Sequence, residues 1–374
     1  MSRITYRKPR LPSHYYVLLE PPDSKGEEVL RFVSERRKIK IKGHSFREFQ
    51  QYVIPLLDGR HTLEEIEAKV ADVFRPEDLE AGLQILAEQD LLEESTDATP
   101  EKPGRIEIEP QSNFFHEVCA DPHSAQERLE RATVTVMGLS GAGASVALAL
   151  AAARVGTVNC VDALPVGSAD PYLCAVFSPA DIGRPRVDVL AQRMEAGSPT
   201  HFVAHARPLE TDADVAKAVR GSDFIACCLD PGQSSLIYKL NRVCLEQNLR
   251  WCACSVSGLE VIVGPTVVPG QTACYMCYRM RAVACAEDPE ADFAFQRMLD
   301  RRRQDDSGRR ENLNFAAGLA ADLLGLEVLK QVSGAMPSPT VGRIVVLDLV
   351  ELSMKKHVVL RKPWCPACFP KEHD

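Results

Sequence analysis

The sequence predicts an α/β fold in which a small domain of three strands and three helices precedes a larger, doubly wound domain with a mostly parallel sheet. A glycine cluster separates an apolar strand from an apolar helix between residues 134 and 154, and strands then alternate with helical segments to about residue 255. Two widely separated Cys-x-x-Cys pairs indicate that the C-terminal end of this larger domain is held by a metal ion.

The composition limits the functions open to the chain. Its 374 residues, 45% hydrophobic and 26% charged, are ordinary for a globular protein of two or three domains. The net charge of −8 disfavours a nucleic-acid partner, because such a partner needs a basic face. No apolar run is long enough to span a membrane, and the N-terminal stretch MSRITYRKPRLPSHYY lacks the apolar core of a signal peptide. We therefore expect a cytoplasmic protein with neither a nucleic-acid nor a membrane partner.

Residues 1–95 form the predicted first domain. Strand-like runs come first, at residues 15–20, 29–34 and 38–42. Three helical segments follow: Ser45 is expected to cap the first, Thr62 and Glu65 form a capping box for the second, and Pro76 suits the first turn of the third. Three strands and three helices in this order predict a winged-helix-like domain.

Two segments lack the periodicity of a regular element. Residues 96–112 are polar, with prolines and a glycine, and are predicted to link the first domain to a second domain at residues 113–374. Residues 286–311 are dense in charge and poorly periodic. For them we predict a solvated, mobile loop with at most one helical turn.

The glycine cluster is the first candidate site. Gly138, Gly141 and Gly143 lie in MGLSGAGAS, between a strand and a helix, where glycines let the backbone approach a phosphate at the helix N-terminus. Asp162 ends the next strand, at a position where an acid can bind a ribose hydroxyl. A tight strand-to-helix turn without any ligand explains the same glycines equally well.

The two Cys-x-x-Cys pairs are the second candidate site. Tetrahedral zinc takes four thiolate ligands, and Cys274, Cys277, Cys365 and Cys368 supply them. A redox role for either pair is the alternative, but turn residues flank both pairs and no secretion signal precedes them, which favours zinc. Four thiolates leave no open coordination position, so the predicted role is structural.

From about residue 114 onward the chain resembles the ThiF-like adenylating domain. The resemblance rests on successive blocks that include VTVMGLSGAGASVALALAAARVGTVNCVDALPVG, FSPADIGRPRVDVL, CCLDP and GPTVVPGQTACYMCY. Members of this group include ubiquitin-activating enzymes and the adenylating enzymes of thiamine and molybdenum-cofactor synthesis. The resemblance implies the same zinc site and a homodimer. It also makes Cys285 a candidate thioester acceptor, although a lone cysteine near charged residues is more often inert.

Departures from the family pattern argue against ATP chemistry. The family's Asn-Leu-x-Arg-Gln segment falls on Asp170-Pro-Tyr-Leu173-Cys174, and its Asp-Asn pair falls on Asp230-Pro231. Leucine cannot neutralise a triphosphate, and arginine at the family's lysine position keeps the charge but not the point-like geometry. We therefore interpret the nucleotide site as vestigial, with no catalytic residue, and assign to it Gly138, Gly141, Gly143, Asp162, Arg186 and Asp230.

The predicted third strand is the candidate for peptide binding. Lysine alternates with isoleucine from 38 to 42, so one face of this strand is cationic and the other apolar. Lysines on an edge strand usually prevent aggregation, but they could also steer an acidic peptide that adds as a further strand. Leucines at helical spacing could form a second wall, or they could all belong to the core. The predicted peptide-binding residues are Arg37, Lys38, Ile39, Lys40, Ile41, Lys42, Leu79, Leu83 and Leu86.

The first domain resembles the precursor-peptide recognition domain of ribosomal natural-product pathways, most strongly at PLLDGRHTLEEI and ILAEQDLLEE. Joined to a degenerate ThiF-like domain, it resembles the leader-peptide-binding partner of the YcaO cyclodehydratases, which make thiazole/oxazole-modified microcins. The resemblance implies an adaptor that binds a precursor leader and presents it to a YcaO-type enzyme for azoline formation. An adenylating enzyme acting on a peptide or sulfur-carrier carboxylate is the alternative. A winged-helix regulator of DNA is disfavoured by the acidic helix TLEEIEAKV.

Overall fold

The computed structural model describes residues 6–22, 27–95, 109–119, 121–194, 198–230, 232–302 and 312–369. Within these ranges the chain divides into two compact units. The N-terminal unit ends with helix α4 (Glu109–Val118), and the C-terminal unit runs from Cys119 onward. The predicted linker at 96–112 lies mostly outside the described residues, and the predicted boundaries at 95 and 113 stay predictions.

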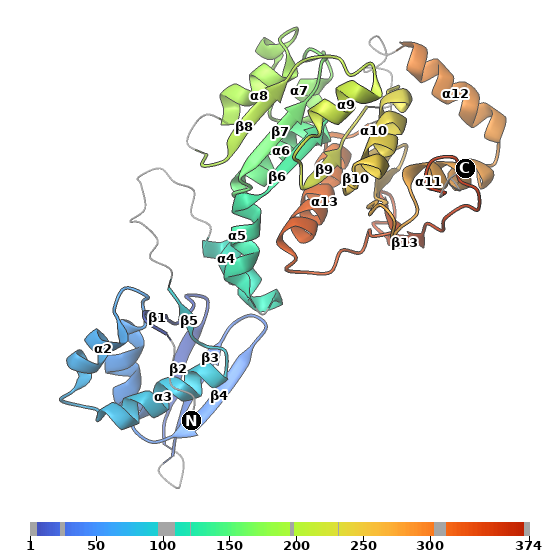
Figure 1. The fold of residues 1–374 in the computed structure, drawn as a ribbon. Helices are drawn as coiled ribbons and strands as arrows, with labels where there is room; N and C mark the ends of the chain where they lie inside the picture. Colours follow the sequence, from blue (N-terminus) through green and yellow to red (C-terminus); the bar gives the residue numbers. More distant parts are fainter. Residues whose placement is uncertain are drawn as a thin grey trace. The chain divides into compact units, whose positions relative to one another are not determined.

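A three-stranded antiparallel sheet forms one layer of the N-terminal unit (Figure 1). Its strands β2 (Tyr16–Glu20), β3 (Glu28–Val33) and β4 (Lys38–Gly43) lie in the order β2-β3-β4. The register places Phe32 opposite both Val17 and Ile39, and these side chains face the core. Because successive side chains of a strand alternate between faces, the lysines of β4 point to the opposite, exposed face. Strands β1 (Pro9–Arg10) and β5 (Glu93–Glu94) form a separate two-stranded antiparallel sheet.

Helices form the other layer of the N-terminal unit. The predicted capping box is confirmed at the start of α2, and the predicted proline lies in the first turn of α3. Ser45 as a cap is wrong: its backbone is left-handed, and the carboxylate of Glu28 accepts instead from the amides of Phe46 and Arg47, at 2.7 and 3.1 Å. The helical segments are α1 (Phe46–Glu48), a π-helical turn η1 (Phe49–Val53), a 3-10 turn η2 (Ile54–Leu56), α2 (Leu63–Val70) and α3 (Pro76–Glu88).

Helix α4 packs on the N-terminal unit. Phe115 of α4 is fully buried, and the Ser34 hydroxyl donates to the Glu117 carboxylate. A 3.2 Å hydrogen bond joins the ring Nδ1 of His14 to the side-chain Oδ1 of Asn113. Part of the segment that precedes the ThiF-like blocks in sequence therefore belongs structurally to the first unit.

An eight-stranded sheet forms the centre of the C-terminal unit and confirms the predicted α/β class. The strand order is β13-β12-β11-β10-β9-β6-β7-β8. Strands β6 to β10 are parallel, as predicted, and the remaining strands extend the sheet with antiparallel pairs. The strands are β6 (Thr133–Met137), β7 (Thr157–Val161), β8 (His201–His205), β9 (Phe224–Cys227), β10 (Trp251–Ser257), β11 (Glu260–Val263), β12 (Arg343–Asp348) and β13 (Met354–Val358).

Helices cover both faces of this sheet, with α6 and α13 on one face and α9 and α10 on the other (Figure 1). The chain runs outward from β6 through β7 to β8 and then returns to β9 on the far side of β6. This reversal is a topological switch point, where the carboxyl ends of parallel strands leave a cleft for a ligand. The helices are α5 (Pro122–Arg131), α6 (Ala142–Ala152), α7 (Asp170–Leu173), a 3-10 turn η3 (Pro179–Asp181), α8 (Arg186–Met194), α9 (Asp212–Ala218), α10 (Ser234–Glu246), α11 (Tyr275–Ala284), α12 (Pro289–Arg302) and α13 (Asn314–Ser333). Within the described ranges, no helix combines the length and the hydropathy that crossing a membrane requires.

The prediction of a loop at 286–311 is wrong over most of its length, because α12 occupies residues 289–302. The Asp288 carboxylate accepts from the amides of Glu290 and Ala291, at 3.1 and 3.0 Å, and Pro289 stands at the first helical position. Leu299 is buried and anchors the helix. An Asp-Pro-Glu start was the available signal for this helix. Residues 303–311 lie outside the described part.

Candidate functional sites

The glycine turn connects β6 to α6 at the switch point. Gly138 has a φ of 86°, and a side-chain Cβ there would lie 2.7 Å from the carbonyl oxygen of Cys228. A Cβ on Gly143 would lie 1.8 Å from the carbonyl oxygen of Gly138. Packing of the turn against the end of β9 therefore already requires both glycines, whether or not a phosphate binds.

A cavity of about 260 Å³ opens beside this turn. Its walls come from residues 140–142, from α7, from the ends of β9 and β10, and from α13. Gly141, one of the glycines assigned from the sequence to the nucleotide site, lines the cavity. Among the described residues that line it, Arg186 is the only basic one.

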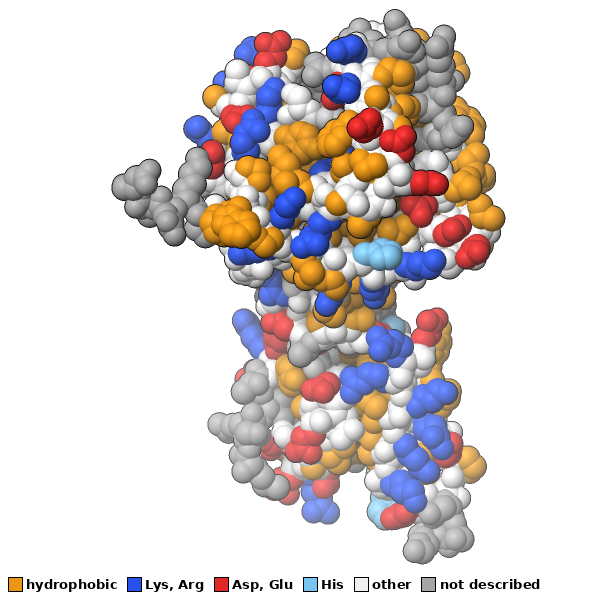
Figure 2. Space-filling view, turned by 90° about the vertical axis from the view of Figure 1, so that its right-hand side faces the viewer, with side chains coloured by type: hydrophobic (Ala, Val, Ile, Leu, Met, Phe, Trp, Pro, Cys, Tyr) orange, Lys and Arg blue, Asp and Glu red, His pale blue; other side chains and the backbone are white. Residues whose placement is uncertain are grey.

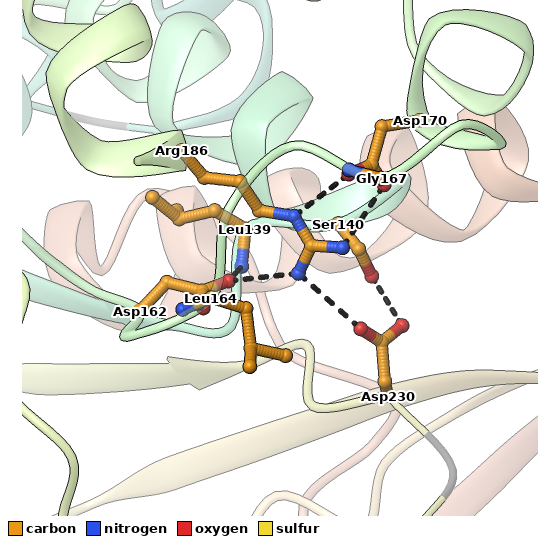
Figure 3. Close-up of polar contacts among 8 residues, drawn as sticks. All are labelled: Leu139, Ser140, Asp162, Leu164, Gly167, Asp170, Arg186 and Asp230. Carbon is orange, nitrogen blue, oxygen red and sulfur yellow. Dashed lines mark hydrogen bonds and ion pairs between the residues drawn. The ribbon is translucent and has the colours of Figure 1, made fainter. Parts of the chain in front are cut away.

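The guanidinium of Arg186 lies among three carboxylates (Figure 3). Its Nε and Nη2 atoms donate to the two oxygens of Asp170, at 2.8 and 3.1 Å. Its Nη1 atom donates to Asp162 at 3.2 Å and to Asp230 at 3.5 Å. Arg186 is 5% exposed, so these are buried ion pairs, and each of its three nitrogens already donates to an aspartate.

Backbone and hydroxyl donors hold the three carboxylates in place. Asp162 accepts from the amides of Leu139 and Leu164, both at 2.8 Å. Asp170 accepts from the amide of Gly167 at 2.7 Å, and Asp230 accepts from a serine hydroxyl of the glycine turn. The whole cluster is therefore fixed by the loops that follow β6, β7 and β9.

Ionisation in this cluster follows from burial and charge. Burial raises the pKa of Asp162, although Arg186 and the two backbone amides act against it. Burial acts to lower the pKa of Arg186, but the three carboxylates outweigh it and the pKa is raised. Arg186 is therefore charged at any ordinary pH, and its charge is balanced within the protein.

The structure brings the predicted residues Asp162, Arg186 and Asp230 together beside the glycine turn. Sequence reasoning gave no role to Asp170, which makes the two-pronged contact with Arg186. The sequence feature that could have indicated this contact is the acidic side chain of Asp170, which stands at the first position of the segment matching the family's Asn-Leu-x-Arg-Gln. Leu173 lines the cavity and Cys174 is buried, so neither supplies a charge there. The neighbouring position 231 lies outside the described residues.

The four predicted metal ligands form one cluster, with all ligand atoms within 4.8 Å of one another. Neighbouring sulfurs are 3.5 to 3.9 Å apart. Zinc–sulfur bonds of about 2.3 Å in a tetrahedron place the sulfurs about 3.8 Å apart. The residues therefore fit a metal such as zinc, and they join the start of α11 to the C-terminal segment.

Burial and backbone donors act in opposite directions on the thiols of this cluster. Burial raises the pKa of the Cys274 thiol to about 11. Burial acts in the same direction on Cys365, but the amides of Ala367 and Cys368 outweigh it and lower the pKa of Cys365. The amide of Lys362 points to the sulfur of Cys277 at 3.3 Å. Backbone N–H groups directed at sulfur are typical of closed structural metal sites.

Cys285, the candidate thioester acceptor, lies at the end of α11 and is exposed. It stands outside both the cavity lining and the four-cysteine cluster. The structure therefore adds nothing that favours a catalytic role.

The predicted peptide-binding strand β4 is the end strand of its sheet in the described residues. Lys38, Lys40 and Lys42 are exposed, and Lys and Arg side chains form a column on the N-terminal unit in Figure 2. Ile39 and Ile41 are half-buried against the core. Arg37 donates to the carbonyl oxygen of Gln89 at 2.9 Å, which ties the start of β4 to the end of α3.

The predicted second wall of a peptide groove is not available in this structure. Leu79, Leu83 and Leu86 are 1%, 0% and 2% exposed and belong to the core of the N-terminal unit. All three leucines pack inside this core, so α3 leaves no exposed leucine face for a peptide to contact. The open edge and cationic face of β4 are the part of the predicted groove that stays accessible.

A doubly wound sheet with a glycine turn and an acid-lined cavity at its switch point defines a protein of the Rossmann-like α/β class, here with a four-cysteine cluster. The chain belongs to the ThiF family, whose sequence profile matches residues 112–367.

Sequence relatives match about two thirds of the chain. Protein HesA of Leptolyngbya boryana is 27% identical over 248 residues, which cover 65% of this chain and 79% of that protein. The sulfur carrier protein adenylyltransferase of Thermus thermophilus is 26% identical over 246 residues, covering 65% and 84%. The molybdopterin-synthase adenylyltransferase of Escherichia coli is 22% identical over 254 residues, covering 65% and 89%.

Solved structures match nearly the whole chain. Escherichia coli MccB in complex with MccA-N7isoASN superposes with a TM-score of 0.65 at 16% identity, covering 96% of this chain and 99% of that chain. PaaA superposes with a TM-score of 0.65 at 18% identity, covering 93% and 99%. At these identities the likeness shows the fold, and at 96% coverage it extends to the part of the chain that precedes the family profile at residue 112.

Proposed function

We propose that this chain is a non-catalytic adaptor in the biosynthesis of a ribosomally made, thiazole/oxazole-modified peptide. Its N-terminal unit, as a winged-helix-like recognition domain, binds the leader of the precursor. The protein then presents the precursor to a YcaO-type cyclodehydratase, which forms the azolines. The observation that carries this proposal is the neutralisation of Arg186 by Asp162, Asp170 and Asp230.

That neutralisation argues against adenylation. A triphosphate needs uncompensated positive charge, and transfer chemistry on it depends on cations placed at the phosphates. Here the one basic side chain among the described cavity-lining residues is already paired, and three carboxylates surround it. An incoming polyphosphate would meet net negative charge in a poorly solvated site, where repulsion is strong.

The N-terminal unit supports the peptide-binding part of the proposal. An edge strand offers unpaired backbone groups, so an extended peptide can add to β4 through main-chain hydrogen bonds. The exposed lysines of β4 favour an acidic leader. Related folds include a microcin C7 biosynthetic enzyme, MccB, solved in complex with N-formylated MccA. That match covers the N-terminal unit as well as the ThiF part, which supports a similar two-part use here.

We also propose that the four-cysteine cluster holds one structural zinc ion and that the protein is a homodimer. The zinc proposal is supported by the sulfur separations and by the closed ligand set. The dimer proposal is supported by family membership alone. Light scattering at micromolar concentration tests it, and a monomer mass would contradict it.

An adenylating enzyme is the second candidate function. Three of the relatives are named adenylyltransferases, and one MccB structure is described as an ATP complex. Asp162 and Asp230, which the sequence assigned to a nucleotide site, are both kept in this chain and both contact Arg186. The two candidates differ in one measurable property, the affinity for ATP.

We predict that the purified protein binds Mg-ATP weakly or not at all and catalyses no exchange of pyrophosphate into ATP. The physical reason is the paired state of Arg186. Isothermal titration calorimetry with Mg-ATP and a radiolabelled pyrophosphate exchange assay measure the two properties. Tight binding together with exchange would replace the adaptor proposal with the adenylating enzyme.

We further predict that charge reversal of Lys38, Lys40 and Lys42 to glutamate weakens leader binding at least tenfold at low salt, with a smaller effect at high salt. Three reversed charges next to a docked acidic strand turn attraction into repulsion, and salt screens both. Fluorescence anisotropy of a labelled synthetic leader, taken from the precursor gene beside the coding gene, gives the affinity.

The matched control is the double variant Lys355→Glu and Lys356→Glu, which reverses exposed lysines on β13 of the other unit. It should leave leader affinity unchanged. Unaltered binding by the β4 variant at low salt would show that the peptide docks elsewhere.

A further inference from the structure

Two cysteines lie side by side in the wall of the cavity, where the proposed function gives them no role. Cys254 belongs to β10, and Cys228 directly follows β9. These strands are parallel neighbours, with Ala226 opposite Cys252 and Cys227 opposite Ala253. Continuing the register places Cys228 opposite Cys254, on the same face of the sheet. Their sulfurs are 3.8 Å apart, and both residues line the cavity.

We propose that Cys228 and Cys254 form a reversible disulfide site, which a small oxidant such as hydrogen peroxide reaches through the cavity. The proposal is independent of leader binding. Neighbouring strands lie about 4.8 Å apart, which falls within the Cα separation of about 4.4 to 6.8 Å that disulfides span. The sulfurs must approach by about 1.8 Å to reach the bonding distance, a movement that side-chain rotation can supply.

The reaction is balanced by the oxidant alone. The thiolate of one cysteine of the pair attacks one oxygen of hydrogen peroxide, which forms a sulfenic acid and releases hydroxide. The sulfur of the other cysteine then attacks the sulfenic sulfur, the S–S bond forms, and hydroxide leaves. The two thiol protons join the two hydroxides, so two thiols and one peroxide give one disulfide and two waters. The protein loses two electrons, and the peroxide gains them.

The surroundings select this pair among the nearby cysteines. Cys227 faces the opposite side of the sheet, in the core with Trp251. Cys252 shares the face of Cys254 but is not part of the cavity lining, and its sulfur points to the carbonyl of Ala253 at 3.6 Å. The hydrogen bond to Cys254 and burial both raise the pKa of Cys228.

Oxidation would act on the cavity itself. Cys228 packs directly against the glycine turn. A Cβ atom added to Gly138 would lie 2.7 Å from the carbonyl oxygen of Cys228, and a Cβ atom added to Gly143 would lie 3.2 Å from the Cβ of Cys228. Asp230, which pairs with Arg186 at 3.5 Å, is two residues further on. Strand β9 lies between β10 and β6, so drawing Cys228 toward β10 pulls the end of β9 away from the glycine turn that follows β6. It also shifts the segment that carries Asp230.

The test treats the metal-loaded, full-length protein with a small excess of hydrogen peroxide and maps its disulfides by differential alkylation and mass spectrometry. We expect a linked Cys228–Cys254 peptide pair, a mass loss of two hydrogens in the intact chain, and reversal by a thiol reductant. Metal analysis of the same sample should show the metal retained, which separates this reaction from oxidation of the four-cysteine cluster.

Variants complete the test. Cys254→Ala and Cys228→Ala should each abolish the linked peptide, whereas Cys252→Ala, on the same strand and face, should keep it. A linked peptide that joins Cys228 to Cys227, or the absence of any Cys228–Cys254 link in the wild-type protein while the metal is retained, would overturn the proposal. The wild-type peptide map decides the question even if a variant fails to fold.

Discussion

Replacing Cys277 with serine is expected to release the bound metal and to lower the melting temperature of the C-terminal unit by about 10 °C. Cys277 is fully buried, its sulfur lies 3.5 Å from that of Cys368, and the cluster joins α11 to the C-terminal segment. Metal binding contributes directly to folding, and a lost ligand costs on the order of 3 kcal/mol or more. The remaining hydrogen bonds, such as that from Arg281 to the carbonyl of Leu360, cannot replace four metal–sulfur bonds.

Metal content by mass spectrometry and melting by differential scanning calorimetry measure the two effects. The matched control is Cys285→Ser, which removes an exposed thiol at the end of the same helix and should change neither value. Protein that is purified without chelator and carries no metal would contradict the zinc assignment. A variant that loses metal without any loss of stability would contradict the structural role.

The sequence predicted correctly those parts of the structure that a short run of neighbouring residues specifies. The glycine turn, the Thr62 capping box and the parallel strands each follow from a short pattern, and the structure contains all of them. The four cysteines converge because each Cys-x-x-Cys pair presents two ligands at short spacing, which is the pattern that a tetrahedral metal site uses. In each case the pattern itself specifies the geometry.

Most of the misses have a different origin, because they depend on contacts between residues that are distant in sequence. Serine is a favoured N-cap residue, but the amides at the start of α1 donate to the carboxylate of Glu28 on β3, and the Ser45 side chain makes no capping hydrogen bond. Leu83 could have faced a peptide, yet the sheet and the neighbouring helices cover it completely. Asp170 was visible as an acid, but its pairing with Arg186 depends on how the loops after β7 fold together. The start of α12 was readable locally and was outweighed by the surrounding charge density.

The Arg186 cluster is the second place where a single side chain has a large expected effect. Removing one partner of a buried ion pair costs more than the pair contributes, because the remaining charges stay buried without compensation. Here three carboxylates would be left together, and Asp162 is already under a burial penalty that raises its pKa. The cost should therefore depend on pH.

We expect Arg186→Ala to destabilise the C-terminal unit by about 3 to 5 kcal/mol at neutral pH. A carboxyl whose pKa is raised in the folded state takes up its proton more readily when folded. The penalty is therefore full above the folded pKa and shrinks as pH falls through it toward the ordinary value of about 4. Denaturant unfolding at about pH 7 and about pH 5 should show a smaller deficit at the lower pH.

The matched control is Arg193→Ala, on the same helix but half-exposed and paired with Asp181, which should show a much smaller deficit and little dependence on pH. Equal deficits for the two variants at neutral pH would show that the guanidinium of Arg186 does not compensate the buried carboxylates, and the argument against ATP binding would lose its basis.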